Sequence, residues 1–397
     1  MRERNDRVLA PRPGRSRLEP HDVIRILHLR DTDRVCGPGK TMIETACASS
    51  PEFRHSIGVF VLDREKDNQY LRAAAARGVN VVAIRSGHQF DPRILRAILR
   101  AVDELGIDII HSHDYKSDIL TWFVSRIRPM PIMTTVHGWI RNALKARLYI
   151  RAGQKTLPYF ERVIAVSQET QAAILACGVP EAKVTVIHNA IVTTNYQPSS
   201  VEPGYVRRRF NLPGKARIIG YIGRLSPEKG QRDLLVAAAQ IVPVRPDVWF
   251  VLAGDGPDRE ALEIMARELG IGERVLFTGH LPDVRPVFRD IEAMALTSHT
   301  EGFPNVVLEA LCMETPVVAT DVGGVREIIE EGVTGVLLPV RAPDRIRDAL
   351  LQVLDRPEWA RGLALAGQRV VHERFTFARR VSREEEVCRQ ILETWRR

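Results

Sequence analysis

The strongest constraint on the fold is a repeated alternation of short apolar runs with helical patterns. Runs rich in Val and Ile recur through the first half of the chain, at 23–29, 56–62, 79–84, 108–111, 132–136, 163–166 and 184–187. Each is bounded by Gly, Pro, Asp or an amphipathic helical segment such as 92–105. Strands that are apolar along their whole length are buried on both faces, and the helices between them supply the crossovers of a parallel sheet. The pattern therefore predicts an α/β fold.

The alternation pauses once and then begins again. Residues 196–209 follow neither the helical nor the strand period and contain Pro, Gly and Ser, which is typical of a linker. A second series of apolar runs follows at 217–222, 248–253, 275–278, 293–296, 316–319 and 335–338. With 397 residues the chain is long enough for two domains. We expect two doubly wound, Rossmann-like domains facing a cleft, with ligands beyond the carboxyl ends of the strands.

Charge and cysteine content indicate which partners and which cellular compartment suit the protein. Residues 1–198 carry 29 Lys and Arg against 20 Asp and Glu, a net +9, whereas the rest of the chain is −1. This asymmetry indicates an anionic partner of the first half, whether membrane lipid, an acidic acceptor or nucleic acid, unless it is simply a solvated basic surface. The five cysteines form no C-x-x-C pair, which argues against disulfides and thiolate zinc sites and for a reducing cytoplasm. No run approaches the roughly 18 apolar residues of a membrane span.

Two cations follow the first strand of the second series. In the segment 220–230, Arg224 and Lys229 lie near a predicted helix entrance. A guanidinium can grip phosphate oxygens through paired hydrogen bonds, and an ammonium adds a point charge. Basic residues on a turn are more often merely solvated, so this segment alone is weak evidence for a phosphate site.

Two carboxylates frame a turn later in the second series. Glu301 stands just past a predicted strand, and Glu309 follows on a helix after a Gly/Pro turn. Carboxylates accept hydrogen bonds from vicinal hydroxyls, and a helix start offers free backbone N–H groups to oxyanions. Two glutamates eight residues apart are, on their own, more often ordinary surface residues.

In combination, these motifs resemble those of glycosyltransferase family 4, the retaining group of enzymes with the two-domain GT-B fold. The resemblance rests on Gly-Arg to Glu-Lys-Gly at 223–230, the paired glutamates at 301–309 and Thr-Pro-Val-Val-Ala-Thr-Asp-Val-Gly-Gly at 315–324, and it spans the chain from about residue 23 onward. It implies that Arg224 and Lys229 bind the donor diphosphate. It further implies a set of donor contacts in the second domain, namely Gly223, Glu301 at the transferred sugar, Phe303 and Asn305 through their backbone, and Glu309 at the ribose.

The same resemblance assigns roles to two segments of the first domain. The family has a Gly-rich loop where this chain has Cys36-Gly-Pro-Gly-Lys-Thr, and because Pro38 departs from the usual Gly-Gly, Gly37 is the better candidate for donor contact. The loop imitates the end of a P-loop, but that motif would need glycine in place of Arg34. A histidine of the family at the end of a later strand contacts the donor sugar, which points to His137 as a catalytic-site residue.

The Arg- and Pro-rich start, the linker and the family resemblance together divide the chain into four segments. We expect a disordered basic tail at 1–22, an acceptor-side domain at 23–198, a nucleotide-sugar-binding domain at 199–375 and a C-terminal helix at 376–397 that crosses back to the first domain.

His111 and His113 would share one strand face, but no third ligand cluster accompanies them, so we expect neither a metal nor a cofactor. The basic amphipathic segment 139–155 either lies on anionic membrane or packs on its own domain.

The sequence therefore predicts a metal-independent retaining hexosyltransferase, peripheral at the cytoplasmic membrane face. It would use a nucleotide diphosphate sugar, with UDP favoured over GDP, and a sugar or lipid-linked sugar acceptor in cell-surface polysaccharide or glycolipid synthesis. A nucleotide-sugar epimerase of the same fold and a catalytically silent nucleotide-binding scaffold are the alternatives. Nucleic-acid binding is suggested only by the pI of about 9.4 and is not expected, because no binding module accompanies it.

Overall fold

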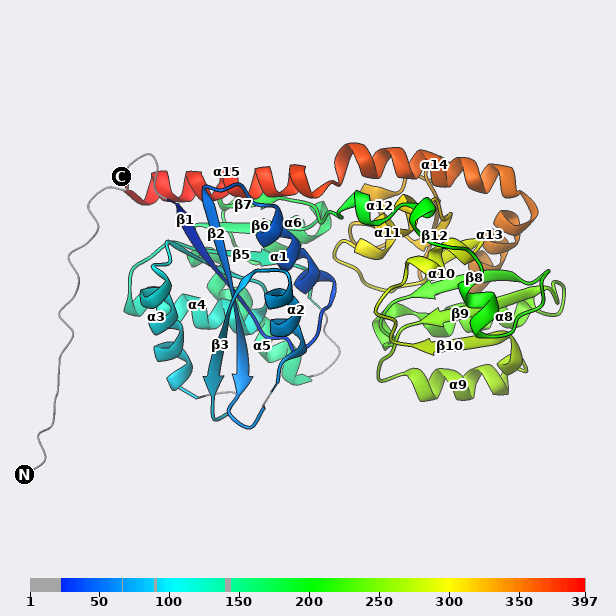
Figure 1. The fold of residues 1–397 in the computed structure, drawn as a ribbon, viewed down its shortest axis with the longest axis horizontal. Helices are drawn as coiled ribbons and strands as arrows, with labels where there is room; N and C mark the ends of the chain where they lie inside the picture. Colours follow the sequence, from blue (N-terminus) through cyan, green and yellow to red (C-terminus); the bar gives the residue numbers. More distant parts are fainter. Residues whose placement is uncertain (1–22, 66, 89–90, 140–143, 397) are drawn as a thin grey trace, which may run out of the picture.

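The computed structural model describes residues 23–65, 67–88, 91–139 and 144–396, and it contains two parallel sheets, one in each half of the chain (Figure 1). The tail expected at 1–22 lies outside these residues. The predicted fold class, two doubly wound α/β units, is confirmed. Most of the strands coincide with the apolar runs of the sequence, because residues without polar side chains can be covered on both faces of a sheet.

The first sheet has seven strands in the order β3-β2-β1-β4-β5-β6-β7, all paired in parallel. Its strands are β1 Ile24–Arg30, β2 Phe53–Leu62, β3 Asn80–Ser86, β4 Ile109–Ser112, β5 Ile132–Val136, β6 Arg162–Ala165 and β7 Val184–Val186. Its helices are α1 Gly37–Ala48, α2 Gln69–Ala76, α3 Arg93–Leu105, α4 Tyr115–Ile127, α5 Leu144–Thr156 and α6 Gln168–Leu175. The strand order reverses between β1 and β4, where such sheets bind ligands.

The second sheet has six strands in the order β10-β9-β8-β11-β12-β13, again parallel, and reverses between β8 and β11. Its strands are β8 Arg217–Ile222, β9 Val248–Ala253, β10 Val275–Gly279, β11 Ala293–Leu296, β12 Val317–Thr320 and β13 Val336–Leu338. The accompanying helices are α7 Tyr205–Arg209, α8 Gln231–Ile241, α9 Arg259–Glu268, α10 Arg285–Asp290, α11 Asn305–Cys312, α12 Val325–Ile328, α13 Pro343–Asp355 and α14 Pro357–Arg374.

Local sequence accounts for the helix ends. The Asp114 side chain accepts hydrogen bonds from the backbone of Lys116 and Ser117, and the Asp114 backbone N–H donates to the Ser117 hydroxyl at 3.1 Å, which forms a capping box at the start of α4. Helix α3 ends because Gly106 adopts a left-handed conformation, with φ of 62°, that glycine accepts without strain.

The last helix, α15 (Phe377–Arg396), lies along the first sheet although it follows the second in the chain (Figure 1). Its apolar face packs on strand residues of that sheet. The contacting side chains from α15 are Val387, Cys388, Ile391 and Leu392, and those from the strands include Ile26, Ile109, Met133 and Ile164. The helix therefore covers one apolar face of the first sheet.

The basic segment expected over 139–155 forms a helix only in part. Trp139 has non-helical backbone, residues 140–143 lie outside the described part, and α5 begins at Leu144. Helix α5 packs against α4, where Gly153 fits close to Tyr115, while Arg151 and Lys155 are exposed. In the described ranges, no helix combines the length and apolar character needed to cross a membrane.

Removing apolar contact from α15 should destabilise the protein. Ile391 is 2% exposed, so Ile391→Ala should lower the free energy of unfolding by about 2–5 kcal/mol through lost burial and a residual cavity. Glu393→Ala, on the exposed side of the same helix, is the matched control. Urea unfolding measures both; equal midpoints would contradict the packing role of α15.

Candidate active site

An ion pair joins the loops that follow β8 and β11. Because these strands are neighbours, their carboxyl ends bring Lys229 and Glu301 together, with Lys229 Nζ 2.7 Å from Glu301 Oε1. The Ser298 hydroxyl donates to the same oxygen at 2.6 Å. Glu301 Oε2 takes part in neither contact. The carboxylate is thus oriented through one oxygen, and the other can accept a hydrogen bond from a ligand.

Arg224 lies in the loop after β8 with an exposed side chain. Its backbone carbonyl accepts a hydrogen bond from Gln231 Nε2 at 2.7 Å, which ties the loop to the start of α8. The Arg224 guanidinium forms no hydrogen bond or ion pair with any described residue. An uncompensated guanidinium in the same loop as the ammonium of Lys229 can bind an anion.

Glycines allow this loop to lie against its neighbours. A Cβ on Gly230, whose φ is 62°, would lie 2.0 Å from the carbonyl oxygen of Thr297. Gly223 donates its N–H to the carbonyl of Ala253 at 2.9 Å, and the Gly223 carbonyl lies against Gly254. Side chains at Gly230 and Gly254 would collide with these carbonyl oxygens and push the loop away from the sheet.

Glu309 binds a lysine and a tyrosine that sequence reasoning did not single out. Lys40 Nζ and Tyr196 Oη each lie 2.7 Å from Glu309 Oε1, and Lys40 also bonds to Tyr196. Burial and the adjacent Glu309 raise the pKa of Tyr196 far above its ordinary value, so its hydroxyl remains a donor. Here too Oε2 is left out of both contacts. The contact crosses between the two halves of the chain, since Lys40 belongs to α1 and Glu309 to α11.

The remaining second-half candidates lie at the start of α11. Asn305 Nδ2 lies 3.5 Å from Thr41 Oγ1 and its Oδ1 is buried without a hydrogen-bond partner in the described part of the chain. Gly37 faces Asn305, because a Cβ there would lie 4.0 Å from Asn305 Nδ2. The Phe303 ring is buried against His188 and Phe375, so only its backbone can reach a ligand.

His137, just beyond β5, touches the loop that carries Glu301. A Cβ on Gly302 would lie 2.1 Å from the His137 carbonyl oxygen, so only glycine permits this approach. His137 Nε2 lies 3.4 Å from His113 Nδ1, while its Nδ1 is buried and unpartnered among the described residues. Burial and the nearby Arg30 lower the pKa of His137 well below its ordinary value. The imidazole is therefore neutral at pH 7.

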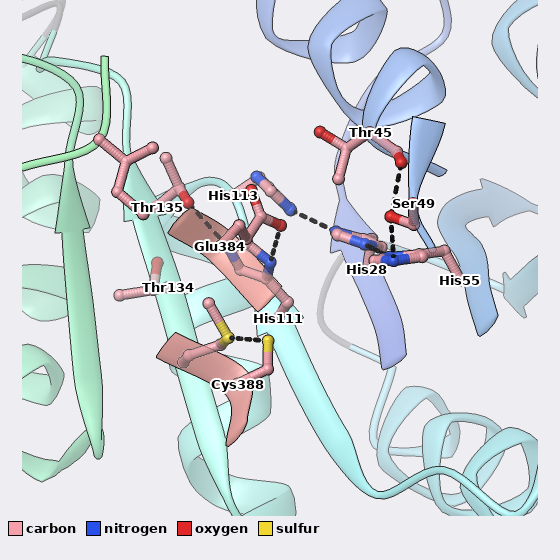
Figure 2. A network of polar contacts seen from close by, with 12 residues as sticks. His28, Thr45, Ser49, His55, His111, His113, Thr134, Thr135, Glu384 and Cys388 are labelled. Carbon is pink, nitrogen blue, oxygen red and sulfur yellow. Dashed lines mark hydrogen bonds and ion pairs between the residues drawn. The ribbon is translucent and has the colours of Figure 1, made fainter. Parts of the chain in front are cut away.

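A third histidine joins the two that the sequence pointed to. Ring nitrogens of His28, His111 and His113 lie within 4.8 Å of one another, all in buried positions (Figure 2). The expectation that no further ligand accompanies His111 and His113 was therefore wrong. His28 lies on β1 directly opposite His111 on β4, and this register is what the sequence pattern did not reveal.

Crowding at Gly230 generates a stability prediction. In Gly230→Ala the new methyl group collides with a backbone carbonyl, which should cost about 1–3 kcal/mol of unfolding free energy and displace the adjacent Lys229. Gly362→Ala on α14, where no atom lies within 4 Å of the added Cβ, should instead be neutral or stabilising by about 0.5–1 kcal/mol. Denaturant titration compares them; similar stabilities would argue against the close loop packing.

Comparisons with known proteins agree with this architecture. Residues 41–195 match the family described as Glycosyltransferase Family 4, and residues 206–369 match Glycosyl transferases group 1. The D-inositol 3-phosphate glycosyltransferase of Thermobispora bispora is 30% identical over 311 residues, which cover 72% of this chain and 71% of the relative.

Solved structures share the fold at low sequence identity. Anabaena HepE in complex with UDP and glucose matches with a TM-score of 0.82 at 22% identity, over 92% of this chain and 100% of that chain. Sucrose-phosphate synthase of Thermosynechococcus elongatus matches with a TM-score of 0.78 at 20% identity, over 94% of this chain and 100% of that chain. With the two family matches and the sequence relative, these likenesses show that the chain belongs to glycosyltransferase family 4, group 1, and is a glycosyltransferase of the GT-B type.

Proposed function

We propose that the protein transfers a hexosyl unit from a UDP-sugar to an acceptor hydroxyl with retention of anomeric configuration. The observation that carries the proposal is the ion pair of Lys229 with Glu301, together with the exposed guanidinium of Arg224 in the same β8 loop, which has no partner among the described residues. This arrangement combines cations for a diphosphate with a carboxylate for sugar hydroxyls.

The two glutamates would bind the donor through oxygens that take no part in the contacts described above. Glu301 Oε2 would accept from the transferred sugar and Glu309 Oε2 from the ribose. Lys229 retains further N–H donors beyond the one directed at Glu301, so it can bind phosphate without leaving the carboxylate. The backbone of Phe303 and Asn305 and the glycines Gly37 and Gly223 would lie along the diphosphate.

The choice of UDP rests on similarity. Anabaena HepE has been crystallised with UDP, with UDP and glucose, and with UDP-glucose, and its fold matches this chain over at least 92% of its length. A hexose donor is consistent with those complexes.

The chemistry would rest on electrostatic stabilisation. Negative charge grows on the β-phosphate as the glycosidic bond breaks, and Arg224 and Lys229 would neutralise it without a metal. The acceptor would attack from the same face as the leaving group, held there by the cleft walls and His137. We assign no covalent nucleophile, and Glu301 is given the role of a hydrogen-bond acceptor for the sugar.

The acceptor side is the more basic half. A sugar or lipid-linked sugar of cell-surface polysaccharide or glycolipid synthesis would suit it, because anionic membrane attracts a basic surface. Exposed Arg151 and Lys155 of α5 would contribute to this peripheral contact, while the opposite side of α5 packs on its own domain.

Loss of either cation should reduce turnover. Arg224→Ala and Lys229→Ala should each lower kcat/KM by roughly 10²–10³, because each removes charge stabilisation from the leaving group. Arg232→Ala, an exposed arginine on α8, is the control and should turn over normally. Turnover of UDP-sugars is measured in excess EDTA. Near-normal rates in both variants would refute the diphosphate site, and a rate that returns only with added divalent metal would refute metal independence.

Membrane contact is tested by flotation with anionic and neutral vesicles. Each basic side chain near an anionic surface contributes about 1 kcal/mol, which salt screens. The double variant Arg151→Glu and Lys155→Glu should therefore float less with anionic vesicles than the wild type. The double variant Arg361→Glu and Arg369→Glu makes the same charge change at exposed positions of α14 and should float like the wild type. Wild type that ignores anionic vesicles would exclude the membrane proposal.

A further inference from the structure

Four histidines and a serine form an unbroken row through the first sheet. Ser49 Oγ lies 2.8 Å from His55 Nε2, His55 Nδ1 lies 2.7 Å from His28 Nε2, and His28 Nδ1 lies 2.9 Å from His113 Nε2. His113 Nδ1 then faces His137 Nε2 at 3.4 Å. The row runs from the end of α1, across β2 and β1, to His113 just past β4 (Figure 2), and His137 just past β5 follows it.

The rings meet end to end. Centroids of successive rings are 5.0, 5.1 and 5.7 Å apart, each longer than the matching nitrogen distance by about the width of one imidazole. The paired nitrogens therefore lie between the rings, near the line joining their centroids. Two imidazoles that share a metal ion would instead direct their lone pairs to a common third point. The geometry is that of hydrogen bonds.

Each ring in the row is neutral at pH 7. Burial lowers the pKa of His28, His113 and His137 well below its ordinary value, and lowers that of His55 to about 4. A neutral imidazole donates through one nitrogen and accepts through the other. In an unbroken row, the direction of one hydrogen bond therefore sets the direction of all the others.

The serine sets that direction. Its hydroxyl donates to the Thr45 carbonyl at 2.8 Å, so towards His55 it can only accept. His55 must then carry its proton on Nε2, and so in turn must His28, His113 and His137. The Nδ1 of His137 is left as a bare acceptor, and this is the buried atom that has no partner in the described part of the chain.

We propose that the row Ser49–His55–His28–His113 is a positioning element that holds His137 in the Nε2–H tautomer, so that its Nδ1 accepts a hydrogen bond from a hydroxyl of the donor sugar. The inference rests on the proposed function. It also restricts the sugar group that can face Nδ1, because a hydroxyl at that position donates a proton to Nδ1 whereas a carboxylate at the same position, as in a uronic acid, has none to donate. His111 stands beside the row, bonded through Nε2 to Thr135, and carries no link of it.

Histidine tautomers are read directly from ring nitrogen shifts. In wild-type protein labelled with ¹⁵N-histidine, His28, His55, His113 and His137 should all be protonated on Nε2 alone at pH 7, with assignments from single substitutions. Protonation of His137 on Nδ1, or on both nitrogens, would overturn the proposal. So would a stoichiometric transition metal that copurifies and is lost in His28→Gln.

A pair of substitutions at His55 separates positioning from packing. His55→Gln keeps an acceptor for His28 and a donor for Ser49, whereas His55→Leu keeps neither. His55→Leu should show mixed tautomers at His137 and a kcat/KM for UDP-glucose roughly 3- to 10-fold below that of His55→Gln, the effect of one hydrogen bond. Binding of UDP, which lacks the sugar, should be equal in the two variants.

Different results would refute the positioning role of the histidine row and the proposed transferase function. Equal kcat/KM and equal His137 tautomers in the His55 variants would refute the positioning role while leaving the transferase intact. A wild type that neither binds UDP nor uses any UDP-sugar would refute the proposed function, yet the tautomer measurement would still decide whether the row has the stated direction.

Discussion

The close approach of two backbone segments determines how the site is built. The carbonyl of His137, past β5 of the first sheet, lies against Gly302, past β11 of the second, with no room for a side chain between them. Parallel sheets collect their polar loops at the carboxyl ends of the strands. This contact therefore brings one such edge against the other, and it places a neutral imidazole next to the loop of an ion-paired carboxylate.

Charge balance follows from the same geometry. Glu301 is compensated by Lys229 from its own half of the chain, whereas Glu309 is compensated by Lys40 from the other half. Both carboxylates are little exposed, and a carboxylate so placed needs a partner. Since each is held through a single oxygen, compensation and ligand binding need not compete. The two halves of the chain are also linked electrostatically at Glu309.

The sequence predicted those features that depend on the periodicity of single strands and helices, such as the α/β class. Lys229 and Glu301 were each predicted as site residues, but their ion pair was not; it arises because strands β8 and β11 are neighbours. Lys40 at Glu309 was not foreseen, because it depends on how two sheets approach. His28 and His55 were missed because periodicity shows that a strand is buried but not which residues of neighbouring strands meet, and the registers of β1 with β4 and with β2 decide that.

Helix α15 has a consequence for how the protein is made. The face of the first sheet that it covers, including Ile26 and Met133, is completed only by residues that follow the second sheet in the chain. A ribosome that adds about 5–20 residues per second needs roughly ten seconds or more to synthesise the intervening segment. During translation the first sheet therefore presents an uncovered apolar face, to which chaperones can bind, until the final helix emerges and closes it.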